Sequence, residues 1–133
     1  METEIKDMII LYVADQQRSR DFYKAILNKE PSLDVPGMTE FALNEKTQLG
    51  LMPENGIAKI LGDALPHPAK GNGIPRCEIY IAVENVKQSF DNLILNGGKA
   101  ISEPQMRNWG HVVAYGSDPD GHVIALASAG TDK

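Results

Sequence analysis

A carboxylate and several aromatic side chains are the groups of this sequence best suited to hold a small molecule. Glu78 and Tyr80 alternate along one strand-like run, so both project from the same face of a strand. A carboxylate enclosed by a cavity anchors a cation or a hydrogen-bond donor, or acts as a lone general base. An exposed indole such as that of Trp109 stacks on planar molecules. The alternatives are that Glu78 is satisfied by Tyr80, Arg107 or a partner chain, and that Trp109 packs on its own sheet or on the partner of a dimer.

The histidines and the cysteine do not predict a metal site. His67, His111 and His122 are dispersed and lack the i, i+4 spacing of a helical metal pair, so each is expected in a turn or at the surface. The single cysteine, Cys77, can form neither an internal disulfide nor a multi-cysteine zinc site. Strand alternation places it on the aliphatic face, as a buried and inert thiol. We expect no metal and no cofactor, and a reducing, cytoplasmic compartment.

Length, composition and charge restrict the class of protein. The chain has 133 residues, 42% of them hydrophobic and 23% charged, as expected for one globular domain with a sizeable core. Eighteen acidic residues against 13 basic ones give a net charge of −5, which argues against nucleic acid as a partner. There is no apolar run long enough for a membrane span. The acidic, polar residues 1–4 do not predict a signal peptide.

The sequence contains two similar halves. A run of β-branched and aliphatic residues at 8–15 returns at 78–85, and each run ends in a residue that starts helices, Asp15 or Asn85. The matching pairs are Ile9 and Ile79, Leu11 and Ile81, Val13 and Val83, Asp15 and Asn85, and Ser19 and Ser89. The repeat predicts that both halves fold in the same way.

Each half reads as a strand, a helix and then two or three antiparallel strands, which is an α+β pattern. Apolar residues recur at helical spacing in 16–27 and after Asn85, where the helix is expected to stop at Asn96-Gly97-Gly98. The further strands are expected at 39–43, 47–52, 100–102, 111–115 and 123–127. We therefore expect a single domain, residues 1–133, with module one at about 5–52, a linker at 53–76 and module two at about 77–128.

The linker at 53–76 contains four prolines and four glycines. Such a long stretch without a predicted element usually carries function or connects domains. It is therefore open whether this segment forms a lid, contacts a partner or is a disordered connector.

Two motifs make a family resemblance recognisable. The strand that leads into Asp15 is followed by Arg18-Ser19 and Phe22-Tyr23, and the chain closes with Asp118-Pro119-Asp120-Gly121 and a last strand. Together with Trp109-Gly110, these motifs resemble the vicinal oxygen chelate superfamily, which includes glyoxalase I, extradiol dioxygenases, fosfomycin-resistance transferases and bleomycin-resistance binding proteins. The resemblance implies two tandem βαβββ modules that form a cupped mixed sheet around a cavity, in a homodimer. Whether the modules pair within one chain or between two stays open.

The resemblance also points to the positions of metal ligands, and here the sequence departs from the family. The three positions correspond to Met8, Glu78 and Ala125, where metal-dependent members carry His, His or Glu, and Glu. A thioether is a weak ligand for a hard or borderline ion, and alanine offers no donor atom. One carboxylate does not hold Zn²⁺, Ni²⁺, Mn²⁺ or Fe²⁺ against water. The site therefore looks closest to the metal-free bleomycin-resistance-like branch, where a tryptophan in a similar loop lines the drug groove.

Strand alternation then sorts the two faces of each module. Ile9, Leu11 and Val13, and their repeat partners, are uniformly aliphatic and are expected beneath the helices. The opposite, cavity face mixes small, apolar and polar residues, which is usual for a small-molecule site. Its expected ligand-binding residues, with the loop tryptophan added, are Met8, Tyr12, Glu78, Tyr80, Trp109 and Ala125.

These observations favour a metal-independent protein that binds a small organic molecule at a cavity near a dimer interface. The alternative is a lactoylglutathione-lyase-like or dioxygenase-like enzyme, with an off-pattern metal site or with Glu78 as its general base. A third hypothesis is a vestigial cavity, plugged by Met8, Tyr12 and Tyr80, in a protein whose dimer surface is the functional part.

Overall fold

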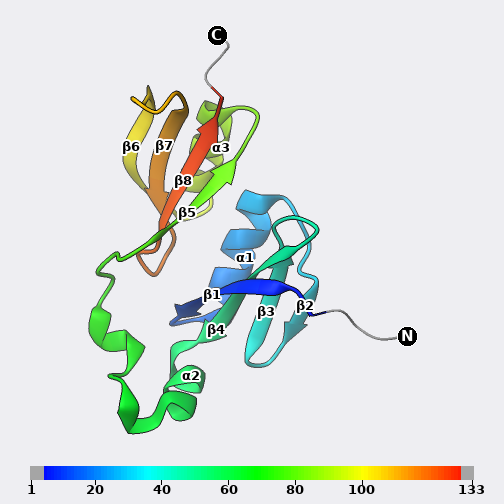
Figure 1. The fold of residues 1–133 in the computed structure, drawn as a ribbon, viewed down its shortest axis with the longest axis vertical. Helices are drawn as coiled ribbons and strands as arrows, with labels where there is room; N and C mark the ends of the chain where they lie inside the picture. Colours follow the sequence, from blue (N-terminus) through cyan, green and yellow to red (C-terminus); the bar gives the residue numbers. More distant parts are fainter. Residues whose placement is uncertain (1–4, 130–133) are drawn as a thin grey trace. The chain divides into compact units, whose positions relative to one another are not determined.

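The computed structural model describes residues 5–129 and divides between Asn72 and Gly73 into two compact units. Each unit contains one four-stranded mixed sheet with a helix packed against it (Figure 1). The predicted α+β class with two similar modules is therefore confirmed. Among the described residues, no helix combines the length and apolar character needed to cross a membrane.

The first unit has the strand order β1-β4-β3-β2, in which β1 runs parallel to β4 and the other neighbours are antiparallel. Its elements are β1 (Asp7–Val13), α1 (Gln16–Leu27), β2 (Leu33–Val35), β3 (Met38–Ala42), β4 (Thr47–Pro53), α2 (Glu54–Leu61) and the short 3-10 helices η1 (Gly62–Ala64) and η2 (Pro68–Gly71). Leu11, Leu51 and Thr39 are aligned across β1, β4 and β3, and all three are buried. The buried Phe22 and Tyr23 of α1 complete this core.

The second unit repeats the arrangement with the order β5-β8-β7-β6, again with one parallel pair, β5 and β8. Its elements are β5 (Glu78–Ala82), α3 (Val86–Leu95), β6 (Lys99–Met106), β7 (Val112–Ser117) and β8 (Val123–Ser128). Helix α3 approaches its sheet closely, because a Cβ atom on Gly116 would lie 2.7 Å from Leu93 Cδ2. One face of this sheet is therefore covered by α3 within the unit.

Helices α1 and α3 begin where the sequence predicts. The side chain of Asp15 accepts a hydrogen bond from Arg18 N at 3.0 Å, and that of Asn85 accepts one from Gln88 N at 3.0 Å. Each cap satisfies one of the backbone N–H groups that the first turn leaves without a partner. At the end of α3, Gly97 adopts a φ of 102°, a conformation that favours glycine, so the predicted stop is also confirmed.

Several details of the prediction were wrong. The first unit contains the additional short strand β2, and β6 extends from Lys99 to Met106 rather than ending at residue 102. An edge strand tolerates Pro104 because one side of its backbone has no strand to pair with, so the proline did not mark the end of the strand. Ile9 is 53% exposed and so does not lie beneath the helix with Leu11 and Val13.

The segment 53–76, whose role stays open, contains helical elements that the sequence did not predict. Residues 54–61 form helix α2, which contacts β4 and β1 through a face that includes the buried Ile57. Cys77 precedes β5 instead of lying within it, and its thiol is exposed, so the expected buried thiol was also wrong. Alternation along a strand does not apply to a residue outside the strand.

Candidate functional site

The face of the second unit that is opposite α3 brings aromatic and polar residues together. Tyr80, Ala125 and Tyr115 are aligned across β5, β8 and β7, and Ser102 of β6 is paired with Tyr115. Residues paired in this way project to the same face. Ala125 is fully buried and packs with Tyr115 in a small apolar cluster, whereas Tyr80 is 42% exposed. The small residue therefore separates two tyrosines on this face.

A tight hairpin carries two further rings to Tyr80. Arg107 N donates to the His111 carbonyl at 2.8 Å and Gly110 N donates to the Arg107 carbonyl at 3.0 Å, which closes the turn between β6 and β7. Trp109 Nε1 donates to the Tyr80 hydroxyl at 2.8 Å, and the same hydroxyl lies 2.6 Å from His111 Nδ1. We call Tyr80, Trp109 and His111 the aromatic network.

The aromatic network has a defined direction of hydrogen bonding. An indole N–H can only donate, so the Tyr80 oxygen accepts from Trp109. When His111 is neutral with its proton on Nε2, the Tyr80 O–H donates to His111 Nδ1. Trp109 is 52% exposed, so the hydrogen bonds hold an aromatic surface that remains accessible to solvent. Such a surface can stack on a planar molecule with little loss of side-chain freedom.

Arg107 lies on the same face, over the ring of Tyr115. Its Nη2 donates to Ser102 Oγ at 2.9 Å and to the Val113 carbonyl at 3.0 Å. Its Cζ is 5.2 Å from the centroid of the Tyr115 ring, a cation–π contact that holds the guanidinium in place.

Glu78 is the first residue of β5 and is paired with Val123. Its side chain is exposed and makes no hydrogen bond or ion pair with any of residues 5–129. Tyr80 and Arg107, which were considered as partners for Glu78, have other partners instead. Glu78 is accessible as a charged group on the face that also holds Tyr80.

In the first unit, Met8 and Tyr12 share one face of β1, as alternation predicts. The side chains of Met8, Ile10 and Met38 converge on Gly50, where an added Cβ atom would lie 2.9 Å from Met8 Sδ and 3.3 Å from Met38 Sδ. This region is apolar and rich in thioethers. Tyr12 is 36% exposed.

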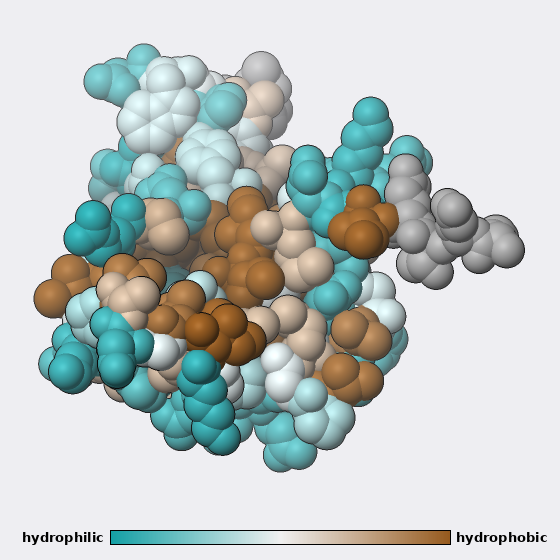
Figure 2. Space-filling view, turned by 60° about the horizontal axis from the view of Figure 1, so that its bottom comes forward, coloured by the Kyte–Doolittle hydropathy of each residue, from teal (hydrophilic) through white to brown (hydrophobic). Residues whose placement is uncertain are grey.

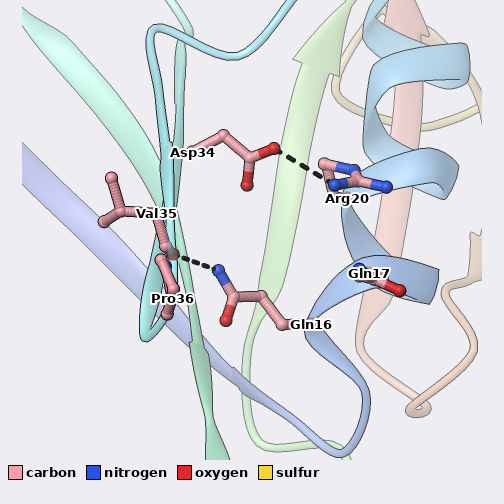
Figure 3. Close-up of a pocket in the computed structure, with 6 residues that line it drawn as sticks. All are labelled: Gln16, Gln17, Arg20, Asp34, Val35 and Pro36. Carbon is pink, nitrogen blue, oxygen red and sulfur yellow. Dashed lines mark hydrogen bonds and ion pairs between the residues drawn. The ribbon is translucent and has the colours of Figure 1, made fainter.

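A cleft of about 370 Å³ lies between α1 and the hairpin of β2 and β3. Figure 3 shows Gln16 reaching the Val35 carbonyl and Arg20 reaching Asp34 across it. Gln16 also donates to Thr39 Oγ1 at 2.8 Å and accepts from Gly37 N at 3.0 Å. Gln16, Arg20 and Asp34 thus brace the hairpin against the helix.

The closing turn gathers Asp118, Asp120 and His122, whose ligand atoms lie within 4.8 Å of one another. The buried Asp118 carboxylate accepts hydrogen bonds from Asp120 N and His122 N, both at 2.9 Å, and lies 2.8 Å from His122 Nδ1. These bonds hold the turn that leads into β8. The group has the donor atoms of a metal site, but its contacts are those of a structural turn.

The two-module fold agrees with the known proteins that this chain resembles. Residues 6–129 match the glyoxalase-like domain family. The chain belongs to this family. No curated protein matches the chain.

Solved structures with the same fold include a glyoxalase-related enzyme from Fulvimarina pelagi, with a TM-score of 0.79 and 20% identity over 95% of this chain and 88% of that one. A glyoxalase/bleomycin resistance protein/dioxygenase from Nocardioides has a TM-score of 0.70 and 20% identity over 100% of this chain and 88% of that one. A glyoxalase/bleomycin resistance protein/dioxygenase family enzyme from Burkholderia phytofirmans PsJN has a TM-score of 0.74 and 14% identity over 92% of this chain and 97% of that one. At these identities the likeness concerns the fold alone.

The metal that many glyoxalase-like domains bind does not fit the residues at the corresponding positions. Met8 lies among apolar side chains over Gly50, and Ala125 is buried and has no donor atom. Glu78 is the one oxygen ligand of the three positions. A divalent ion needs about three nitrogen or oxygen ligands from the protein, so we assign no chemistry to a metal at these positions.

The structure brings together only part of the residue set predicted from the sequence. Tyr80 and Trp109 are hydrogen-bonded, and Ala125 lies beside Tyr80 but is buried. Met8 and Tyr12 belong to β1 of the first unit. His111 and Tyr115 were not predicted as members of this face, and Arg107 was considered only as a partner for Glu78. The signal was the position of Arg107 and His111 on either side of Trp109, because a tight hairpin brings such neighbours to one face.

Proposed function

We propose that this glyoxalase-like domain is a metal-independent protein that binds a small organic molecule, in the manner of the bleomycin-resistance-like branch. The observation that carries the proposal is the aromatic network, in which hydrogen bonds hold an exposed indole and an exposed phenol at fixed positions. Binding costs less when the contacting rings are already ordered. The proposed ligand contacts Trp109 and Tyr80 directly, and Glu78 lies on the same face as Tyr80.

Two further parts of the proposal concern assembly and compartment. We include a homodimer, with the binding cavity near its interface, because large apolar side chains such as Ile9 and Ile101 are exposed. Figure 2 shows hydrophobic residues reaching the surface between hydrophilic ones. We include the cytoplasm because the single cysteine is a free, exposed thiol. Light scattering of the purified protein measures its mass and so tests the dimer.

A thermal-shift screen in the presence of a chelator tests the binding function. A library of planar small molecules is expected to contain compounds that raise Tm, because a ligand that binds the native state stabilises it. The shift should be lost in Trp109→Ala. It should persist in Leu95→Ala, which also removes an exposed apolar side chain but from the end of α3. A shift that requires added metal, or that survives in Trp109→Ala, would contradict the proposal.

A second candidate function is an enzyme of the family, lactoylglutathione-lyase-like or dioxygenase-like. The observation in its favour is the distance of 2.6 Å between the Tyr80 hydroxyl and His111 Nδ1, which suits proton transfer, together with the accessible carboxylate of Glu78. Turnover of a hemithioacetal or a catechol that is lost in Glu78→Gln would favour this function over binding alone.

A further inference from the structure

The charge of Arg107 has no counterion in the part of the chain that the structure describes. Its guanidinium donates to Ser102 Oγ and to the Val113 carbonyl, and its Nη1 lies 3.4 Å from Gln105 Oε1. All three acceptors are neutral. The ion pairs formed within residues 5–129 do not include Arg107. A partly buried charge is normally paired, so this guanidinium lacks its usual counterpart.

The Nε atom of Arg107 also lacks an acceptor within the described residues. It is enclosed by neighbouring atoms and has no hydrogen-bond partner among residues 5–129. Buried donors are nearly always paired, and an unpaired donor is most costly on a charged group. The Tyr115 ring holds the guanidinium, so the side chain is ordered although this donor is unused. Because Nε is enclosed, an acceptor from outside the chain would reach the guanidinium through Nη1, whose contact with Gln105 Oε1 is the longest of the three at 3.4 Å.

The aromatic network lies close to this cation in the fold. Arg107 opens the hairpin that carries Trp109 and His111. Tyr115 lies beneath the guanidinium. It is paired with Ala125 of β8, which is in turn paired with Tyr80 of β5, so the two tyrosines lie two strands apart. Neighbouring strands are 4.7–4.9 Å apart, so these two strands are separated by about 10 Å. A molecule the size of a substituted aromatic ring can contact the network at one end and Arg107 at the other.

We propose that Arg107 binds the carboxylate of a planar organic monoanion whose ring stacks on Trp109. The proposal rests on the proposed binding function and specifies the class of its ligand. A planar carboxylate matches the flat guanidinium in shape and charge. The exposed Glu78 on this face and the net charge of −5 disfavour a dianion such as a phosphate monoester.

A fluorescence titration tests this assignment, because Trp109 is the single tryptophan and reports directly on the face. The probes are benzoate, its neutral isostere benzamide, and phenyl phosphate, at constant ionic strength. We expect wild-type protein to bind benzoate at least tenfold more tightly than the other two. Arg107→Gln should bring benzoate to the level of benzamide, and Arg107→Lys should lose several-fold. Lys87→Gln makes the same charge change on α3, which covers the opposite face, and should leave all three affinities unchanged.

Each outcome decides between the claims. Equal binding of benzoate and benzamide, or a benzoate preference that survives in Arg107→Gln, overturns the role of Arg107 and leaves the binding function in place. Tighter binding of phenyl phosphate overturns the assignment of a monoanion. Absence of saturable binding by any probe overturns the ligand class, while the library screen decides the binding function separately. Circular dichroism of each variant verifies folding, and Arg107→Lys retains the charge if Arg107→Gln is unstable.

Discussion

Replacement of Tyr80 by phenylalanine removes the one oxygen atom that Trp109 and His111 share. The ring remains, so packing on the sheet is unchanged, and only the hydrogen bonds of 2.8 Å and 2.6 Å are lost. A net hydrogen bond contributes about 0.5–1.5 kcal/mol. Because Tyr80 and Trp109 are 42% and 52% exposed, water can satisfy the freed groups. We therefore expect a loss at the low end, about 1 kcal/mol in total, or about 3–5 °C in Tm for a chain of this size.

The assay combines thermal unfolding with the fluorescence of the single tryptophan. Without its hydrogen bond, the indole of Trp109 should gain mobility, which lowers its fluorescence anisotropy and increases quenching by acrylamide. Ligand affinity should fall as well, because the ring is no longer held in place before binding. Tyr12→Phe is the matched control for anisotropy and quenching. Tyr12 is 36% exposed, and its hydroxyl makes no hydrogen bond with any other described residue.

The reasoning would be refuted by a Tyr80→Phe variant whose anisotropy, quenching and Tm all equal those of the wild type. That result would show that Trp109 is not held by Tyr80 in solution. A change of equal size in Tyr12→Phe would show that loss of any tyrosine hydroxyl affects the indole. Either outcome would remove the observation on which the proposed function rests.

Three further predictions concern packing, the closing turn and metal. Gly98→Ala should destabilise the protein by about 2 kcal/mol, because the new Cβ would lie 2.8 Å from a backbone carbonyl oxygen. The Cβ of Gly56→Ala in α2 would meet nothing within 4 Å, so this control should be neutral or stabilising by up to about 1 kcal/mol. Urea unfolding measures the free energy of unfolding of both variants. Asp118→Ala should cost about 2–4 kcal/mol in the same assay, because a buried carboxylate that accepts two backbone hydrogen bonds is lost, and Asp118→Asn should cost less. Elemental analysis after incubation with Zn²⁺, Ni²⁺, Mn²⁺ or Fe²⁺ and desalting should find far fewer than one ion per chain; one ion per chain, lost in Glu78→Gln, would reveal an off-pattern site.

Features that depend on neighbours in the sequence could be predicted well. Asp15 and Asn85 mark helix starts because a capping side chain acts on a backbone group only three residues away. The repeat of the strand run predicted that the second sheet would copy the first, and both sheets do have one parallel and two antiparallel pairings. The resemblance drawn from the closing turn agrees with the family match over residues 6–129.

The errors arise where a contact between distant residues decides the outcome. Helix α2 was not predicted in a segment rich in glycine and proline, because burial of Ile57 against the first sheet supports it. Ile9 lies in a strand with the expected alternation but is exposed, since alternation gives the face of a residue and not whether another element covers that face.

The sequence by itself determined the α+β modules, because these follow from residue types and local periodicity. The family resemblance identified the departure at the metal positions, and strand alternation placed Tyr80 among the expected ligand-binding residues, to which the loop residue Trp109 was added. Only the tertiary structure joined them to His111 and Arg107. Tyr80 and His111 are separated by 31 positions in the chain and meet through a hairpin that bends toward the far edge strand of the sheet. Likewise, no local pattern shows that the Nε of Arg107 lacks an acceptor, because hydrogen bonding depends on every atom that surrounds a buried group.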